Sequence, residues 1–261
     1  MVQPLFHLTR DIIMQRFEDQ VALITGAAGG IGQATAIRLA SEGAAVFCVD
    51  LDTEGLKHTV ATIETANGKA LSHTCDVSDE QAVINTIATC ISTYGKINHV
   101  SNMAGILRFD HLHETKIEDF QKIMQVNVGG TFLVCKHALP ELIKSKGNIV
   151  NAASTSTLAG VPWAGIYSAS KGAVLAMTKS MSIEYCKQGV RANCVCPGDI
   201  ITGMASPSFP NNVDMKLMDR CMSPTGRRGP EVVASVIAML ASSDGEHITG
   251  EDIRVDGGTL S

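Results

Sequence analysis

Short aliphatic runs alternate along the chain with longer segments whose apolar residues recur at helical spacing. Such runs predict strands, and their almost continuous apolar character is typical of strands buried on both faces of a sheet. The alternation indicates repeated βαβ units around a parallel sheet. The predicted strands are 21–25, 44–50, 70–77, 96–105, 147–154, 190–198 and 252–256. The predicted helices follow the glycine-rich turn after the first strand and cover 53–67, 79–93, 116–137, 165–187 and 231–240.

The length of 261 residues fits one α/β domain or two smaller ones. No stretch rich in Pro, Gly and Ser interrupts the alternation, so we expect one domain over 19–261 and an N-terminal arm over 1–18. In that arm the run IIMQRF is patterned as a short amphipathic helix. Residues 203–229 contain three prolines and form the least regular stretch.

Composition and charge exclude several classes of protein. Apolar residues make up 45% and charged residues 18%, which excludes a disordered chain. Lys and Arg number 21 against 26 Asp and Glu, and no basic block is present, so we expect no nucleic-acid partner. No apolar stretch approaches ~18 residues, so we expect no membrane partner.

The eight cysteines contain no C-x-x-C pair and no Cys/His spacing suited to zinc. Several lie within apolar runs, where a free thiol behaves as a small hydrophobic group. The first residues carry mixed charges and no apolar core of a secretory signal. We therefore expect reduced thiols, no metal site and a cytoplasmic protein.

A glycine-rich turn, TGAAGGIG (25–32), separates the first predicted strand from its helix. Glycines let the backbone approach a pyrophosphate, which then rests on the N-terminus of the helix. A purely structural turn is the alternative, but the position directly after the first strand favours dinucleotide binding. The candidate contacts are Gly26, Gly29, Gly30, Ile31 and Gly32.

The second predicted strand ends in Asp50, about 20 residues beyond this turn, where dinucleotide-binding domains place the acid that contacts the adenosine ribose. A carboxylate there repels a 2′-phosphate, so the predicted cofactor is NAD rather than NADP. The neighbouring Asp52 is interpreted as a solvated acid or a helix cap. The two residues exchange roles if the strand ends two residues later.

Tyr167 and Lys171 are four residues apart at the start of a predicted helix, so both side chains lie on one helix face. A free tyrosine has a pKa near ~10, and an adjacent ammonium stabilises its phenolate. Ser154 ends the fifth predicted strand, and parallel strands present their carboxyl ends to a common crevice. This spacing favours a tyrosine general acid/base with a serine that binds an oxygen carrying developing charge.

Taken together, these segments resemble the short-chain dehydrogenase/reductase (SDR) family, in its NAD-preferring main branch. The resemblance extends in order from about residue 19 to 258. One departure is Met103 in the segment NMAG (102–105), where the family usually has a second Asn. The resemblance rests on the turn at 25–32, NMAG, Asn127 in QVNVGG, Ser154, YSASK (167–171), PGDIIT (197–202) and ITGEDIRVDGG (248–258).

The resemblance implies a Rossmann-type domain with a central seven-stranded parallel sheet and helices on both faces, assembled as a homotetramer. It also implies a catalytic tetrad of Asn127, Ser154, Tyr167 and Lys171, in which Asn127 orders a water of a proton relay; pattern alone marks Asn127 only as a polar helix residue. Further cofactor contacts that it implies are Asp76, Val77, Asn102, Ala104, Gly105, Tyr167, Lys171, Pro197, Gly198, Ile200 and Thr202.

The predicted function is NAD-dependent interconversion of a secondary alcohol and a ketone by hydride transfer. The alternatives are a 3-oxoacyl-(carrier protein) reductase and a non-catalytic dinucleotide-sensing module. The expected partner is a small-molecule alcohol or ketone, held by walls from 107–109, 155–163 and 203–229. Methionines in the last segment either face that substrate or pack the segment onto the core, and Arg108 is a candidate for an anionic substrate group.

Overall fold

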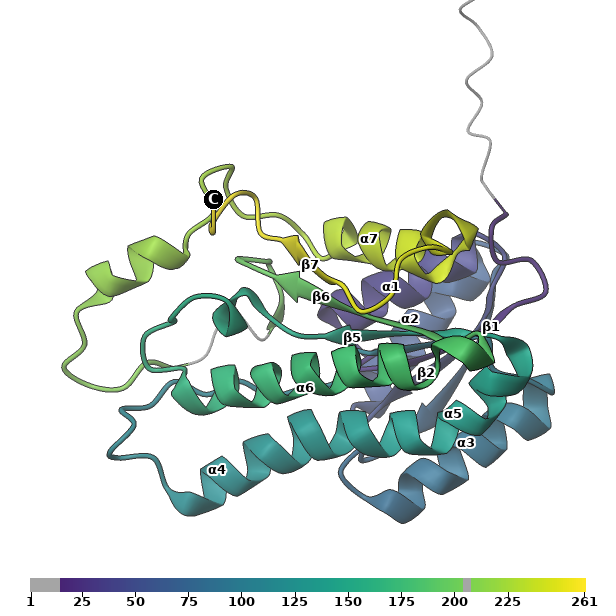
Figure 1. The fold of residues 1–261 in the computed structure, drawn as a ribbon, viewed down its shortest axis with the longest axis horizontal. Coiled ribbons are helices and arrows are strands. Elements are labelled where there is room, and N and C mark those ends of the chain that lie inside the picture. The colour runs from purple at the N-terminus through teal and green to yellow at the C-terminus, as the bar shows by residue number, and fades with distance from the viewer. Residues whose placement is uncertain (1–14, 204–207) are drawn as a thin grey trace, which may run out of the picture.

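The computed structural model describes residues 15–203 and 208–261 (Figure 1). In these ranges seven parallel strands form one sheet in the order β3-β2-β1-β4-β5-β6-β7. The predicted doubly wound architecture is therefore confirmed. The strands are β1 (Val21–Thr25), β2 (Ala45–Asp50), β3 (Lys69–Thr74), β4 (His99–Asn102), β5 (Asn148–Ala152), β6 (Arg191–Pro197) and β7 (Asp252–Val255).

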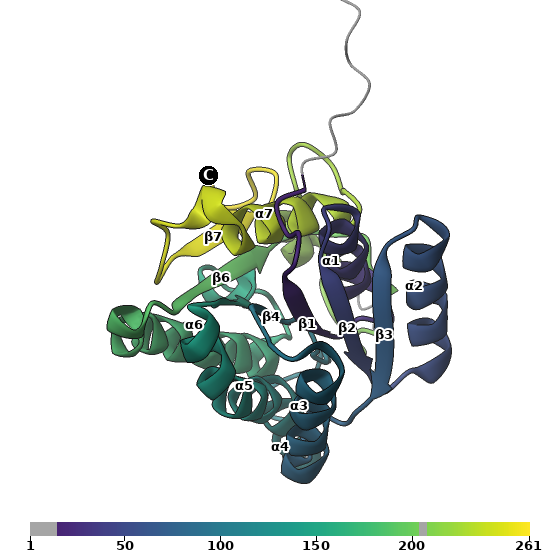
Figure 2. The ribbon, with the colours of Figure 1, turned by 90° about the vertical axis from the view of Figure 1, so that its right-hand side faces the viewer.

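Helices cover both faces of the sheet. Figure 2 shows α1, α2 and α7 on one face and α3, α5 and α6 on the other, and α4 packs beside α6. The α-helices are α1 (Gly30–Ser41), α2 (Thr53–Thr65), α3 (Glu80–Tyr94), α4 (Ile117–Met124), α5 (Thr131–Ser145), α6 (Gly165–Glu184) and α7 (Glu231–Ala241). A π-helical turn, η1 (Gln125–Gly130), joins α4 to α5, and 3-10 turns include η2 (Thr155–Thr157) and η5 (Met215–Cys221).

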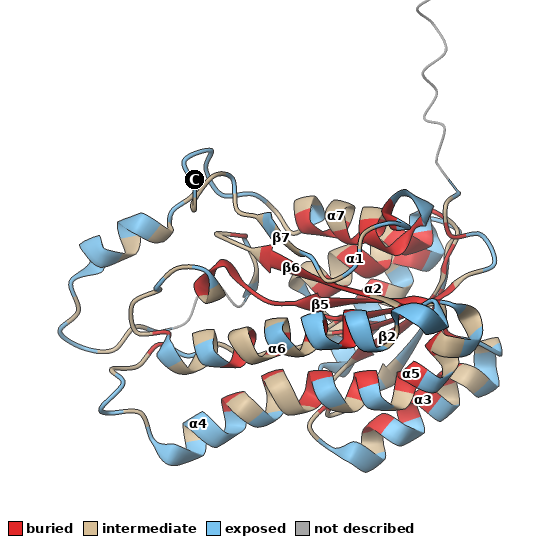
Figure 3. Ribbon diagram, in the orientation of Figure 1, coloured by how far each residue is buried: buried red, intermediate tan, exposed pale blue. Residues whose placement is uncertain are grey.

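The two faces carry separate aliphatic cores. In β1, Ala22 and Ile24 face the core beneath α1 and α7, whereas Val21 and Leu23 face the core beneath α3 and α5. This alternation follows from the two-residue period of a strand. Because both faces are covered, the central strands are buried along their length (Figure 3), as their continuous apolar sequence predicts.

Several predicted element boundaries differ from the structure. The predicted strands 70–77 and 96–105 are too long, since β3 ends at Thr74 and β4 at Asn102. The predicted helix 116–137 is three consecutive elements that continue to Ser145, with Pro140 inside α5. Proline removes a helical hydrogen bond, but buried Leu139 and Leu142 anchor α5 to the core on either side of it.

The described end of the predicted arm packs onto the domain. Phe17 is buried in the core beneath α1 and α7. The Arg16 guanidinium forms ion pairs of 2.6 Å with Glu42 and with Asp244. The first half of the run IIMQRF, residues 12–14, lies outside the described residues. Across 15–203 and 208–261, no helix is long and apolar enough to cross a membrane, and no three metal-ligating side chains cluster.

Candidate active site

The glycine-rich turn brings the start of α1 close to the loop after β4. A Cβ on Gly26, which has a φ of +70°, would lie 2.8 Å from the amide nitrogen of Ala104. A Cβ on Gly32 would lie 2.1 Å from the carbonyl oxygen of Gly26. Gly29, the N-cap of α1, supplies no side chain to cap the helix. The turn therefore packs tightly behind α1 and leaves its N-terminal amides open to an anion.

A cleft of about 980 Å³ starts at this turn and follows the carboxyl ends of the neighbouring strands. It lies at the point where the strand order reverses between β1 and β4, which is where doubly wound sheets bind ligands. Glu118, Gln121, Lys122 and Gln125 also line it, and no sequence signal marks them. The predicted contacts on its wall are Gly26, Gly29, Gly30, Ile31, Gly32, Asp50, Asp76, Val77, Ala104, Gly105 and Thr202.

Asp50 ends β2, as predicted, and its carboxylate is fixed from two sides. Its Oδ2 accepts a hydrogen bond of 3.1 Å from the Ala28 amide, and its Oδ1 accepts one of 3.1 Å from the Asp52 amide. Asp52 caps α2 by accepting from the amides of residues 54 and 55. The alternative in which the two acids exchange roles is not favoured, because Asp52 is committed to the cap.

A second cavity of about 260 Å³ adjoins the cleft and contains the predicted catalytic side chains except Asn127. It shares Ile31, Met103 and Thr202 with the cleft. The second cavity thus brings together residues from the ends of β5 and β6 and from α6. Predicted site residues on its wall are Ser154, Tyr167, Lys171, Pro197, Gly198, Ile200 and Thr202.

Ser154 is positioned by the short turn that follows β5. Its Oγ accepts a hydrogen bond of 3.1 Å from the Ser156 amide and so caps η2. Because the oxygen is held by an N–H donor, the hydroxyl hydrogen stays available to donate toward the cavity.

Tyr167 and Lys171 project from the first turns of α6. Lys171 Nζ donates to the carbonyl oxygen of Ala152 at 2.8 Å and lies 5.8 Å from the centre of the Tyr167 ring. Burial lowers the pKa of Lys171 to about 8. Burial also raises the pKa of Tyr167, and the nearby Ser154 side chain acts in the opposite direction. The Tyr167 pKa is therefore not lowered as expected: desolvation raises it, and the opposing effect comes from Ser154 rather than from the ammonium.

Asn127 lies in η1 and is fully buried, lining neither cavity. Its Oδ1 accepts from the Ile106 amide at 2.8 Å, and its Nδ2 donates to the Ile106 carbonyl and to Ser170 Oγ. A Cβ on Gly105 would lie 3.2 Å from Asn127 Oδ1 and 3.3 Å from Lys171 Nζ. Asn127 thus joins the loop after β4 to α6 directly behind Lys171.

Asn102, a predicted cofactor contact, is not brought to the wall of either cavity. It is the last residue of β4, and its Nδ2 donates to Asn151 Oδ1 on β5 at 2.8 Å. The loop that follows is held instead by Thr25 Oγ1, which accepts from the amides of Met103 and Ala104. Asn102 connects adjacent strands beneath the cleft.

The expected substrate walls meet at the second cavity. From the segment 203–229, Phe209, Met218 and Met222 line it, whereas Met215 and Leu217 do not and are about half exposed. Phe209 stacks on Phe109 with a centroid distance of 4.5 Å. Met204 lies outside the described residues. Ser156, Asp199 and Arg227 also line the cavity. Ser156 and Arg227 lie within the expected walls and Asp199 within PGDIIT, but nothing in the sequence singles these residues out.

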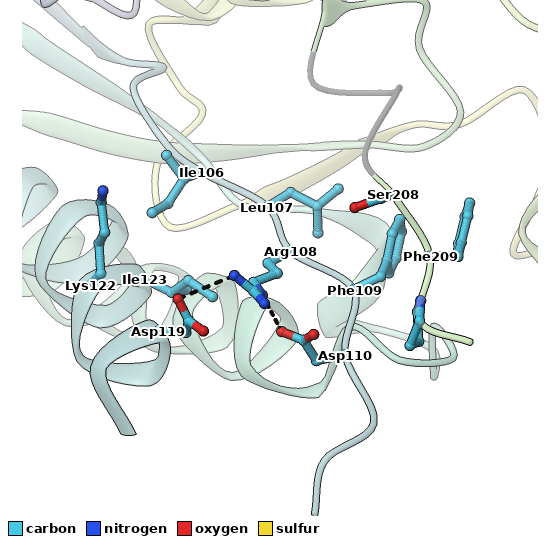
Figure 4. A pocket seen from close by; sticks show the side chains of 11 residues that line it. Ile106, Leu107, Arg108, Phe109, Asp110, Asp119, Lys122, Ile123, Ser208 and Phe209 are labelled. Carbon is cyan, nitrogen blue, oxygen red and sulfur yellow. Dashed lines mark hydrogen bonds and ion pairs between the residues drawn. The ribbon is translucent and has the colours of Figure 1, made fainter. Parts of the chain in front are cut away.

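An outer pocket of about 500 Å³ borders the second cavity at Leu107, Phe109 and Phe209 (Figure 4). Arg108 lies at its centre, between the carboxylates of Asp110 and Asp119, and forms ion pairs with both. Its charge is therefore already matched within the protein. Arg108 is not positioned as a free receptor for an anionic substrate group.

Comparisons with known proteins agree with this geometry. A family model described as "Enoyl-(Acyl carrier protein) reductase" matches residues 26–259. "Meso-2,3-butanediol dehydrogenase" of Serratia marcescens is 39% identical, with 94% of this chain and 96% of that protein covered. "3-oxoacyl-[acyl-carrier-protein] reductase FabG" of Thermotoga maritima is 38% identical over 94% and 99% of the two chains. The structure of NAD+-bound xylitol dehydrogenase matches with a TM-score of 0.84 and 31% identity over 93% and 100%.

A doubly wound sheet, a glycine turn at its switch point and a Ser/Tyr/Lys cavity define a nucleotide-dependent oxidoreductase. The chain belongs to the short-chain dehydrogenase/reductase family, as its motifs predict. Its activity is accordingly the interconversion of alcohols and ketones.

Proposed function

We propose that this protein oxidises a secondary alcohol with NAD, or reduces the corresponding ketone with NADH. The proposal rests on one observation: the cavity with the predicted catalytic side chains adjoins the cleft with the predicted dinucleotide contacts. A cavity with Ser154, Tyr167 and Lys171 on its wall opens beside a cleft that begins at the α1 N-terminus and contains Asp50.

The cleft fits a dinucleotide that lacks a 2′-phosphate. Among the described residues, its wall carries the carboxylates of Asp50, Asp52, Asp76 and Glu118 but a single basic residue, Lys122. The open amides of α1 would hold the pyrophosphate, and Asp50, with acceptor capacity left on both oxygens, would hold the ribose hydroxyls. When bound, the nicotinamide accepts or returns the hydride. Supporting this choice, the related xylitol dehydrogenase structure contains NAD+.

The side chains of the second cavity would handle the proton. In oxidation the Tyr167 phenolate takes the hydroxyl proton of the substrate, and in reduction the phenol returns it. The Ser154 hydroxyl donates to the substrate oxygen and orients it. Lys171, buried beside Tyr167, stabilises the phenolate while its ammonium is charged and would hold the nicotinamide ribose, as expected of the family. Asn127 acts as a positioning residue behind Lys171 and as the site of the ordered water expected of the family.

Replacement of Tyr167 tests the proposal directly. Tyr167→Phe should lower NAD-dependent turnover of secondary alcohols by at least about a thousandfold, because the proton acceptor is lost. NADH binding, followed by its fluorescence, should remain within a few-fold of the original value. The matched control is Tyr185→Phe at the end of the same helix, which should retain full turnover.

Two outcomes contradict the proposal. Turnover that survives in Tyr167→Phe would remove the role of this tyrosine. A strong preference for NADP across the same alcohols would remove the role of Asp50.

The substrate class has one alternative, a 3-oxoacyl group on a carrier protein, because FabG of Thermotoga maritima is a relative of similar identity. We favour small alcohols, since carrier proteins require a basic docking face and this chain has a net charge of −5. The relatives named for butanediol and for 2,5-dichloro-2,5-cyclohexadiene-1,4-diol also support small diols or related alcohols. Faster NADH oxidation with a 3-oxoacyl thioester than with any small ketone would favour the alternative.

We also propose a homotetramer in the cytoplasm. Exposed apolar side chains on α4, α5 and α6 support subunit contacts there, among them Phe120, Phe132 and Ile183. All eight cysteines are free, which suits a reducing compartment.

A further inference from the structure

One edge of the second cavity is ionic, although most of its wall is apolar. Asp199 and Arg227 both line it, and Arg227 Nε donates to Asp199 Oδ1 at 2.8 Å. The Asp199 side chain is 17% exposed and that of Arg227 43%, so the carboxylate is the more enclosed partner. Among the described residues on this wall, Asp199 is the only acid.

The backbone holds this pair in place from both sides. Asp199 lies two residues after the end of β6, and Arg227 comes from the far end of the segment 203–229. Their neighbours form a parallel bridge between Ile200 and Arg228, and the Ile201 amide donates to the Arg228 carbonyl at 2.8 Å. The ion pair is therefore a fixed feature of the wall, positioned by main-chain contacts one residue away.

Two buried polar atoms of residues that line this cavity have no partner among the described residues. Asp199 Oδ2 and Ser156 Oγ are shielded from solvent and accept or donate no hydrogen bond within 15–203 and 208–261. An enclosed carboxylate oxygen without a donor is energetically costly, so such groups are normally satisfied. Oδ2 has no protein hydrogen bond to lose, so a small rotation of the carboxylate toward the cavity, followed by the half-exposed Arg227 that holds Oδ1, would let Oδ2 accept from a bound group.

The chemistry of the pair selects the group that it can bind. The pair is neutral overall, so neither a substrate carboxylate nor a substrate ammonium gains a net charge attraction from it. An alkyl group would leave Asp199 Oδ2 unsatisfied. A neutral hydroxyl fits both partners, because it donates to the carboxylate and accepts from the guanidinium.

We infer that Asp199, paired with Arg227, is a specificity residue for a second hydroxyl, and that the substrate is a diol or polyol. This inference rests on the proposed alcohol dehydrogenase function. The reacting carbinol lies at Ser154 and Tyr167, and the second hydroxyl lies at the ionic edge.

Matched alcohols that share a carbon skeleton provide the test: 2-butanol with 2,3-butanediol, and cyclohexanol with cyclohexane-1,2-diol. The wild-type protein should show a kcat/KM for NAD-dependent oxidation roughly ten- to a hundredfold higher for the diol, as one charge-assisted hydrogen bond provides. Asp199→Leu should bring the ratio of diol to mono-ol close to one. Asp199→Asn, which keeps the shape and one acceptor oxygen, should give an intermediate ratio.

Asp219→Asn is the control, because Asp219 is an exposed acid of the same segment that lines neither cavity. It should retain the wild-type ratio. NADH titration of each variant verifies folding. In the wild-type NADH complex, 2,3-butanediol should raise the melting temperature more than 2-butanol, and this difference should vanish in Asp199→Leu.

A wild-type ratio at or below one, or a ratio that Asp199→Leu leaves unchanged, would overturn the inference while the dehydrogenase function stands. Absence of NAD-dependent oxidation of every alcohol in the wild type would instead overturn the proposed function and the inference with it.

Discussion

His99, at the start of β4, is a buried titratable residue that lies apart from both cavities. Its Nδ1 lies 2.6 Å from Asn148 Oδ1 and its Nε2 lies 2.6 Å from Ser101 Oγ. Asn148 uses its Nδ2 to donate to the Ala241 carbonyl, so its Oδ1 accepts and His99 Nδ1 must carry the hydrogen. Burial lowers the pKa of His99 to about 4.

This pKa makes the protein sensitive to acid. Between pH 6.5 and 4 the unfolded chain binds a proton on His99 that the folded chain does not bind, so the free energy of unfolding falls as pH falls. For His99 alone we expect a loss of about 2 kcal/mol between pH 7 and pH 5. Urea unfolding at the two pH values measures it.

His99→Gln should reduce this pH dependence, whereas replacement of the exposed His58 by Gln should leave it unchanged. An identical loss between pH 7 and pH 5 in wild type and His99→Gln would show that His99 is not its source.

At the scale of single residues, sequence spacing predicted correctly those site residues that regular strands and helices carry. One cavity wall contains Ser154, Tyr167 and Lys171, because the end of β5 and the start of α6 both border this cavity. Asp199 and Arg227 could not be paired in this way, since they lie 28 positions apart in the sequence with no regular spacing to relate them. The direction of the Tyr167 pKa also required the structure, because it depends on burial rather than on spacing.

Among the elements, α1 depends on a glycine inside its first turn. A Cβ on Gly32 would lie 2.1 Å from the Gly26 carbonyl oxygen, which is main chain and has little freedom to move. Gly32→Ala should therefore lower the free energy of unfolding by about 2–4 kcal/mol and weaken NADH binding, because α1 must shift away from the turn.

The control for this substitution is Gly172→Ala within α6. A Cβ there meets nothing within 4 Å, so alanine should stabilise the helix by about 0.5–1 kcal/mol. Chemical unfolding of both variants measures the difference, and a Gly32→Ala protein as stable as wild type would contradict the packing argument.

The hydrophobic period predicts that each helix and strand exists, but it does not predict the residues at which the element begins and ends. β3 and β4 stop where pairing with a neighbouring strand stops, a tertiary limit that residue type does not encode. The wide turn η1 interrupts a continuous helical pattern at Asn127. Such π-helical turns are frequent at functional sites, and the polar residue in an otherwise regular period was the only hint of this one.

For the whole molecule, the doubly wound parallel sheet was predictable because strands alternate with helices and the motifs occur in the order typical of the family. The assembly is a separate prediction. Light scattering at micromolar concentration should give the mass of four chains. Phe132→Glu on α5 should reduce that mass, since Phe132 is 48% exposed and apolar, whereas Leu71→Glu on the edge strand β3 should not. A wild-type monomer would contradict the tetramer.

The bridge between Ile200 and Arg228 has a consequence for how this enzyme can change. It holds the two ends of one long loop next to each other. The entropic cost of closing such a loop rises only slowly with the number of residues in it. Insertions, deletions or whole exchanged sequences between the fastened ends should leave the sheet intact. New substrate ranges can therefore arise by replacement of the loop beyond Gly203, with the proton-transfer residues and the dinucleotide cleft inherited unchanged.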